Sequence, residues 1–190
     1  MLLLFSVPTP IFAFELSDLK KLQALNECIR CDLSKADLSH SDLFKAKLTG
    51  AYLFMINLSG ADLREADLSE ADLTEGNLSN AFFPDGDLKG ANLTKANLTA
   101  AYMNSVDLKG ATMVEADLKG AYLSLSTLSY VDFTGANLVG AFLYNADLFK
   151  ANLSGANLTG ANMKGANLEG AIFCETQTPW GEENSGCLTN

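Results

Sequence analysis

A large apolar residue stands at every fifth position from Leu33 to Phe173, in twenty-nine consecutive pentapeptides without an insertion or a deletion. Two residues before it stands a small residue, which is Ala in twenty-one pentapeptides, and the residue between them is Asp or Asn in twenty. A period of five matches neither an α-helix, at about 3.6 residues, nor a β-strand, at about 2. We therefore expect a solenoid in which each pentapeptide forms one short side and a turn, with the small and the large apolar residues pointing inward.

The repeated unit resembles that of a known family. ADLSE at residues 66–70, ANLTK at 91–95 and ANLSG at 151–155 resemble the repeats of the pentapeptide repeat family, and the resemblance covers residues 31–173. It implies an all-β fold, the right-handed quadrilateral β-helix, with four pentapeptides in each coil. The twenty-nine pentapeptides then make about seven coils, and at ~4.8 Å per coil the rod is about 35 Å long.

Both ends of such a solenoid need a cap, because an open coil edge exposes unpaired backbone groups. Before the repeats, leucines recur at helical spacing, which predicts a short capping helix within residues 14–30. After the repeats, residues 174–190 form a turn-rich tail that contains two cysteines. The predicted organisation is a signal peptide (1–13), the capping helix, the repeat β-helix (31–173) and this tail.

The four cysteines lie in two pairs, one at each end of the predicted rod. Because the ends are about 35 Å apart, and a disulfide needs Cα atoms within ~7 Å, crossed pairing and a four-cysteine zinc site are excluded. The tail resembles the disulfide-closed end of exported cyanobacterial and chloroplast-lumen pentapeptide proteins, which implies a bond between Cys174 and Cys187. Cys28 and Cys31 have C-x-x-C spacing, for which we favour a structural disulfide and keep thiol exchange as the alternative. Haem attachment is disfavoured because Asp32 replaces the required histidine.

The first residues of the chain indicate export. Residues 1–13 are apolar and too short for a membrane span of about 20 residues, and they are typical of a secretory signal cleaved after Ala13. Paired cysteines indicate an oxidising compartment as well. The family resemblance implies the periplasm or the thylakoid lumen, and the cytoplasm is the alternative.

Nothing in the repeats predicts catalysis or cofactor binding. The leucines are expected to fill the interior, and no insertion is present to build the wall of a pocket. The single histidine, His40, falls at an outward position with no triad around it. We therefore predict no enzyme activity, no cofactor and no metal. The net charge of −10 disfavours nucleic acid as a direct partner, because no basic stripe is available to neutralise phosphates.

Several pentapeptides depart from the pattern, among them those around Phe83. Phe83 takes the position of the large residue, and Gly76 and Gly86 take the small position on either side of it. We expect both glycines to make room for the bulkier ring.

Residues twenty apart are expected to lie directly above one another in successive coils. This stacking predicts an outward aromatic ladder of Phe82, Tyr102, Tyr122 and Phe142 with rungs ~4.8 Å apart. The rings either shield the backbone beneath them or form a docking surface for a protein.

Two function classes follow. The favoured one is an exported, rigid, non-enzymatic interaction module that presents the aromatic ladder to an unknown protein partner, with a homodimer left open. The alternative, implied by the family resemblance, is a DNA-mimicking protein that binds a type II topoisomerase. The predicted signal peptide and disulfides favour the first class, because they separate the chain from a cytoplasmic topoisomerase.

Overall fold

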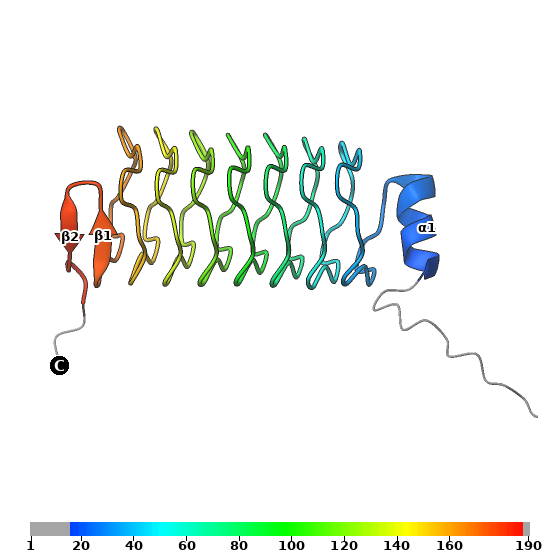
Figure 1. The fold of residues 1–190 in the computed structure, drawn as a ribbon, viewed down its shortest axis with the longest axis horizontal. Coiled ribbons are helices and arrows are strands. Elements are labelled where there is room, and N and C mark those ends of the chain that lie inside the picture. Colours follow the sequence, from blue (N-terminus) through cyan, green and yellow to red (C-terminus); the bar gives the residue numbers. More distant parts are fainter. Residues whose placement is uncertain (1–15, 188–190) are drawn as a thin grey trace, which may run out of the picture.

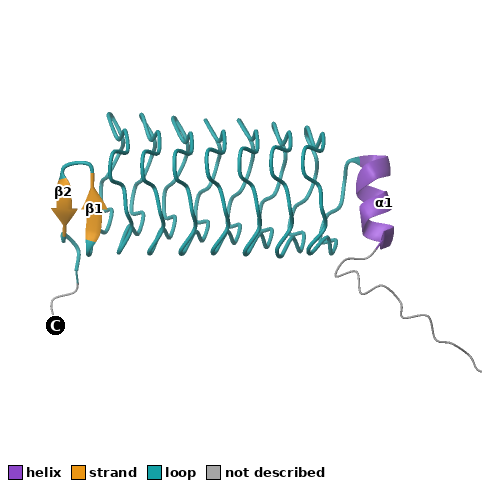
Figure 2. Ribbon diagram, viewed as in Figure 1, coloured by secondary structure: helices purple, strands orange, loops and turns teal. Residues whose placement is uncertain are grey.

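The fold is a stack of coils with a different cap at each end. The structure is a computed structural model that describes residues 16–187. Within this range, helix α1 (Leu16–Leu25) lies at one end and the antiparallel strands β1 (Thr176–Thr178) and β2 (Gly181–Glu183) lie at the other (Figure 1). The coils between them are drawn as loops in Figure 2, because neighbouring coils meet through single β-bridges rather than through longer strands.

Successive coils are offset by twenty residues. Parallel bridges join each residue that precedes a large apolar one to the residue twenty positions later, through the range 27–177. The Leu118 N–H donates to the Asn137 carbonyl of the following coil at 2.7 Å. The Asp117 N–H donates to the Ala96 carbonyl of the preceding coil at 3.0 Å. Four pentapeptides therefore complete one coil, and each coil is hydrogen-bonded on both sides.

The polar residue of each pentapeptide shapes the corner that follows it. The Asp67 carboxylate accepts the Ser69 N–H at 3.0 Å and the Ser69 hydroxyl at 2.6 Å. Asn57 accepts the same two groups of Ser59, at 3.2 Å and 2.8 Å. These local bonds satisfy the backbone of the turn. The corner ends on a residue with positive φ, such as Gly60 at +64°, a conformation that glycine adopts without strain.

The apolar residues of the repeats fill the interior of the stack. Leu118 has no exposed surface, and Ala116 is 1% exposed. The buried Ser126 hydroxyl donates to the Met103 carbonyl at 2.7 Å. Within residues 16–187, every buried side-chain nitrogen or oxygen has a hydrogen-bond partner. The interior is therefore a packed apolar core, as the five-residue pattern predicted.

The two glycines near Phe83 have different roles. A Cβ atom on Gly86 would lie 2.6 Å from the Phe83 ring, so this glycine makes room for the ring as predicted. The prediction for Gly76 is wrong, because its Cβ would meet the Leu73 carbonyl oxygen at 2.9 Å and the Ile56 side chain at 3.5 Å. Gly76 follows Ile56 by twenty residues, and it lies against the larger side chain that replaces Ala in that column.

The first and last coils are covered by the two caps. Leu22 of α1, which lies within the range predicted for a capping helix, packs into the core and is 3% exposed. The Asp18 carboxylate of α1 accepts the Asp32 N–H of the first coil at 2.9 Å. At the other end, the Phe173 N–H donates to the Ser185 carbonyl of the tail at 2.8 Å. The predicted signal peptide, 1–13, lies outside the described residues. None of the described helical structure is both long and apolar enough to cross a membrane.

Replacing Leu118 by Asp tests the filled interior. An unpaired carboxylate in this apolar core costs on the order of several kcal/mol, which is comparable to the whole stability of a typical domain. We expect Leu118→Asp to abolish cooperative folding, measured by circular dichroism and thermal unfolding. The control Leu118→Met keeps the volume and should cost less than about 1.5 kcal/mol. An unchanged melting curve for Leu118→Asp would show that Leu118 does not point inward.

Replacing Gly86 by Ala tests the packing around Phe83. The added Cβ overlaps the ring, so we expect a loss of about 1–3 kcal/mol in the free energy of unfolding. In a Phe83→Leu background the ring is gone, and the same substitution should cost much less, which a double-mutant cycle by denaturant unfolding measures. Equal losses in the two backgrounds would contradict the assigned contact.

Candidate interaction surface

The four predicted ladder residues lie in one column and contact one another. The Tyr102 and Tyr122 rings are parallel within 6°, with centroids 4.4 Å apart. Tyr122 and Phe142 stack in the same way at 4.7 Å and 6°. Phe82 meets Tyr102 edge to face, at 5.9 Å and 60°. The coil register thus turns four residues spaced twenty apart into one aromatic ladder.

Stacking decides which part of each ring can meet a ligand. Both faces of Tyr122 are covered, one by Tyr102 and one by Phe142. A sugar that binds by lying flat on a ring needs an open face, so the centre of the ladder does not fit that mode. The ring edges and the tyrosine hydroxyls remain accessible, and Phe82, Tyr102 and Phe142 are each about 40% exposed. The ladder offers a strip of ring edges, which suits contact with a protein surface.

Tyr122, at the centre of the ladder, is uncharged at neutral pH. The neighbouring Tyr102 hydroxyl raises the pKa of Tyr122 above its ordinary value, first by hydrogen bonding and then by charge repulsion. An ordinary tyrosine already titrates near pH 10. The Tyr122 hydroxyl is therefore neutral and can both donate and accept a hydrogen bond at the centre of the strip.

Arg64 lies beside Phe82 at one end of the ladder. Arg64 Nε donates to Asp62 Oδ1 at 2.9 Å, and Arg64 Nη2 donates to Asp62 Oδ2 at 2.6 Å. These bonds hold the pKa of the Asp62 carboxyl below its ordinary value. The guanidinium carbon lies 5.7 Å from the Phe82 ring centroid and 5.3 Å from that of Phe44. Arg64 thus places a charged group against the Phe82 ring, at the end of the ladder nearest the first coils.

Two exposed residues that the sequence reasoning missed extend the ladder sideways. Leu125 is 60% exposed and Tyr144 is 43% exposed, and the Leu125 N–H donates to the Tyr144 carbonyl at 2.9 Å. Leu125 has φ +63°, a left-handed conformation that is unfavourable for a bulky residue. The signal was present in the sequence, because Leu125 occupies a corner position where most other repeats have glycine, a polar or a charged residue. We call these two residues and the aromatic ladder together the ladder surface.

A second aromatic group lies on another corner. Tyr130 and Phe149 meet edge to face at 5.6 Å and 82°. The Lys150 ammonium lies 5.1 Å from the Phe149 centroid and 5.8 Å from that of Tyr130. Tyr130 also has positive φ, at +62°. These two rings, with the Lys150 ammonium beside them, provide a comparison for the ladder surface.

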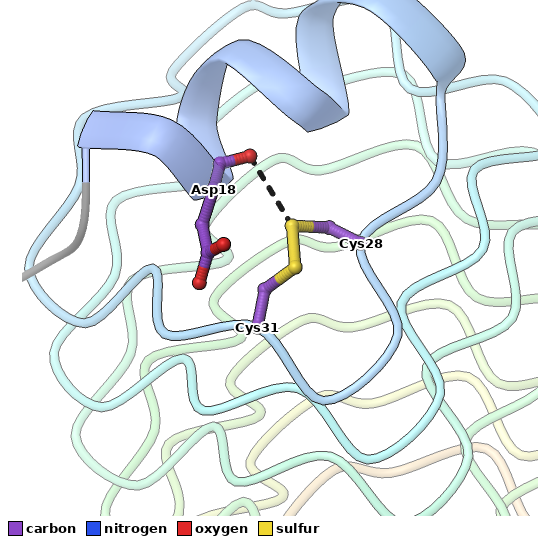
Figure 3. Close-up of side chains that lie close together, drawn as sticks. All are labelled: Asp18, Cys28 and Cys31. Carbon is purple, nitrogen blue, oxygen red and sulfur yellow. Dashed lines mark hydrogen bonds between the residues drawn. A yellow bond between two sulfur atoms is a disulfide. The ribbon is translucent and has the colours of Figure 1, made fainter.

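The four predicted cysteines are joined within each end of the rod. The structure bonds Cys28 to Cys31, with Cα atoms 5.3 Å apart, and Cys174 to Cys187, with Cα atoms 4.7 Å apart. Cys28 Sγ lies 3.2 Å from the carbonyl oxygen of Asp18, below α1 (Figure 3). The Asp18 carboxylate lies within 4.8 Å of both sulfur atoms. Because the two sulfur atoms are bonded to each other, neither is a thiolate available to a metal ion.

Comparison with known proteins agrees with this geometry. The pentapeptide repeats profile matches in eight copies, over residues 27–54, 56–90, 91–129, 126–165 and 151–177. A search of curated proteins finds no match.

Three solved structures show the range of similarity. HetL, a pentapeptide repeat protein involved in heterocyst differentiation regulation in the cyanobacterium Nostoc, is 33% identical, with 82% of this chain and 81% of HetL covered and a TM-score of 0.38. A trypsin-treated form of QnrB1, a plasmid-mediated fluoroquinolone resistance protein, is 18% identical, with 76% and 89% covered and a TM-score of 0.50. A pentapeptide repeat protein of the Arabidopsis thaliana thylakoid lumen is 33% identical, with 60% and 66% covered and a TM-score of 0.22.

The repeat matches and the fold shared with QnrB1 imply a right-handed quadrilateral β-helix. The five-residue pattern, the coil register of twenty residues and the profile matches between residues 27 and 177 agree. Together they show that the chain belongs to the pentapeptide repeat family.

Proposed function

We propose that this protein is an exported, non-enzymatic module of about seven coils whose ladder surface binds a protein partner. The observation that carries the proposal is the ladder of stacked, partly exposed rings on a rod with a net charge of −10. Exposed aromatic side chains surrounded by polar residues are enriched where proteins dock, and aromatic residues supply much of the binding energy there.

The exposure of Leu125 supports the same surface. Its positive φ is shared by the corner residues of the other repeats, among them Met55 and Tyr130, and so is not itself a mark of function. Leu125 is 60% exposed beside the aromatic ladder, and an exposed apolar side chain next to exposed rings enlarges the apolar area that a partner can cover.

The non-enzymatic part rests on the shape of the repeats. The interior is filled by apolar side chains, and the outward residues are spread along flat sides and short corners. A catalytic site needs a concave pocket with converging polar groups. His40 is exposed at a corner.

Export rests on the cysteines. Both cysteine pairs are bonded in the structure, and structural disulfides persist in oxidising compartments. We infer a location in the periplasm or the thylakoid lumen, after removal of residues 1–13. The 174–190 tail then serves as a disulfide-closed end.

The acidic surface gives less support to the alternative of DNA mimicry. Asp67, Asp87 and Asp107 form a column that resembles a row of phosphates. However, the Lys89 ammonium lies 3.4 Å from the Asp87 carboxylate and 2.9 Å from that of Asp107. The column is therefore partly neutralised, which weakens its likeness to a DNA backbone.

Intact mass of the protein from its native cells tests export and disulfide bonding together. We expect a chain that lacks residues 1–13 and takes up four alkyl groups only after reduction. A full-length chain with four free thiols would contradict the proposed location and would favour the topoisomerase alternative.

Substitution of the ladder tests the binding role. In cells that produce the Tyr102→Ser/Tyr122→Ser variant, we expect the complex that contains this protein to dissociate, because loss of interface anchors commonly weakens binding more than about tenfold. The size of the complex is measured by size-exclusion chromatography of an extract of the compartment that contains the protein. The control Tyr130→Ser/Phe149→Ser removes the other aromatic pair and should leave the complex intact. A complex that survives in the ladder variant would show that this surface is not the docking site.

A further inference from the structure

We propose that Asp85 is a modification site, at which the main chain of the folded rod converts from an aspartyl to an isoaspartyl link. The Gly86 nitrogen attacks the carboxyl carbon of the Asp85 side chain, and no enzyme is needed for this step. The product is a substrate for methyltransferases that use S-adenosylmethionine to esterify isoaspartyl carboxylates. This chemistry does not depend on the proposed docking role of the ladder surface.

The sequence singles out this position among the aspartates. Asp85–Gly86 is the one Asp–Gly pair of the chain, and no Asn–Gly pair is present. Every other aspartate is followed by leucine, except Asp132, which is followed by phenylalanine. Glycine has no side chain to hinder the attack and the least restricted backbone, so an Asp–Gly pair forms the cyclic imide more readily than these others.

The attacking nitrogen lacks the hydrogen bond that closes the other turns. In every other repeat of residues 31–171, the N–H at the small position donates to the carbonyl oxygen three residues earlier, at 2.9–3.4 Å. The Gly86 N–H makes no such bond to Phe83. A phenylalanine alone does not open the turn, since the Ala136 N–H donates to the Phe133 carbonyl at 2.9 Å.

The same corner is also held less tightly to its neighbours. The Asp85 N–H donates to the Asn104 carbonyl at 3.2 Å, and the Glu65 N–H donates to the Pro84 carbonyl at 3.2 Å. These are the two longest of the bonds that join corners of successive coils within residues 16–187. Ring closure requires rotation of the Asp85 main chain, and this corner has fewer and weaker bonds to break than the others.

The Asp85 side chain is available to react. It is exposed at the corner, and it forms no ion pair within the part of the chain that the structure describes. By contrast, the Asp67 and Asp87 carboxylates each accept an N–H two residues later, at 3.0 Å and 2.9 Å. Those aspartates shape a turn, whereas the Asp85 carboxyl is open to solvent.

The reaction balances with water alone. In the acid form of Asp85, the bond between Cγ and the Gly86 nitrogen forms, and one carboxyl oxygen leaves as water with the amide proton and the carboxyl proton. Water then opens the ring. Opening at Cγ restores aspartate, whereas opening at the main-chain carbonyl leaves isoaspartate, in which the chain runs through Cβ and Cγ. No oxidant, reductant or metal takes part.

The product alters a corner that has little room. An isoaspartyl link adds one atom to the main chain, although the repeats keep their length constant from residue 31 to residue 173. Even a Cβ atom on Gly86 would lie 2.6 Å from the Phe83 ring. The modification therefore acts on the packing of Phe83 and on the end of the ladder at Phe82, which precedes the same corner.

The same corner of the next coil provides a matched control. Asn104–Ser105 forms the same cyclic imide in an unstructured chain, with loss of ammonia. In the folded rod the attacking Ser105 N–H donates to the Ser124 carbonyl at 3.0 Å, and Asn104 Oδ1 accepts the Ser124 N–H at 3.0 Å. Both reacting groups are held, so we expect Asn104 to stay unmodified.

Incubation of the folded protein for several weeks, at neutral pH and physiological temperature, tests the site. Isoaspartate is located by electron-transfer fragmentation of the digested protein and quantified with an isoaspartyl methyltransferase and labelled S-adenosylmethionine. We expect it to accumulate at residue 85, relative to a sample digested at the start, with no deamidation of Asn104. In denaturant, where the rod is unfolded, both sites should react. Asp85→Glu keeps the charge but disfavours the five-membered ring, and it should remove the signal.

Isoaspartate at residue 85 together with an intact Asn104 supports the proposal. Equal modification of both sites in the native sample would show that the reaction proceeds through the unfolded chain. An Asp85 that reacts only in denaturant would show that the folded corner protects it. Either of these two results overturns the proposal, and neither affects the docking role, which the Tyr102→Ser/Tyr122→Ser variant tests separately.

Discussion

The whole structure depends on filling a narrow interior with one small and one large apolar side chain on each side of a coil. Leu118 and Ala116 show this pairing, because both are buried and the backbone around them is bonded to the coils before and after. The interior has little room to spare, and Gly86 beside the bulky Phe83 ring is a local adjustment to a larger side chain. This constraint keeps the five-residue period unbroken and leaves the outward positions free to vary.

A regular coil turns sequence spacing directly into surface pattern. Residues twenty apart stand above one another, so a short run of aromatic substitutions becomes a continuous ladder with rings 4.4–5.9 Å apart. The same register places Asp67, Asp87 and Asp107 in a column, where Lys89 offsets part of the charge. The register therefore orders the outward side chains into columns and corners, and the ladder surface combines one such column with the corner beside it.

The backbone could be predicted from the sequence, whereas much of the surface detail could not. The period of five specified the inward residues, and the coil length followed from the family resemblance, so the column of Phe82, Tyr102, Tyr122 and Phe142 was predictable. The orientation of its rings was not, because stacked and edge-to-face pairs differ little in energy and the choice depends on neighbours such as Arg64. Leu125 was missed because its exposure and positive φ follow from its corner position, which a search for inward residues ignores. The role of Gly76 was assigned wrongly because the atoms nearest to it belong to Leu73, Leu78 and Ile56, and none belongs to Phe83.

Amide hydrogen exchange of the purified protein, followed by mass spectrometry, tests most directly the claim that the filled interior holds all coils in one stack. The account predicts slow exchange through the central coils, residues 60–140, because each of them is bonded to a coil on both sides. Exchange should be faster in the first and last coils, which have a coil on one side only. Central coils that exchange as fast as the ends would show that the inward leucines do not form a continuous core, and would contradict the account.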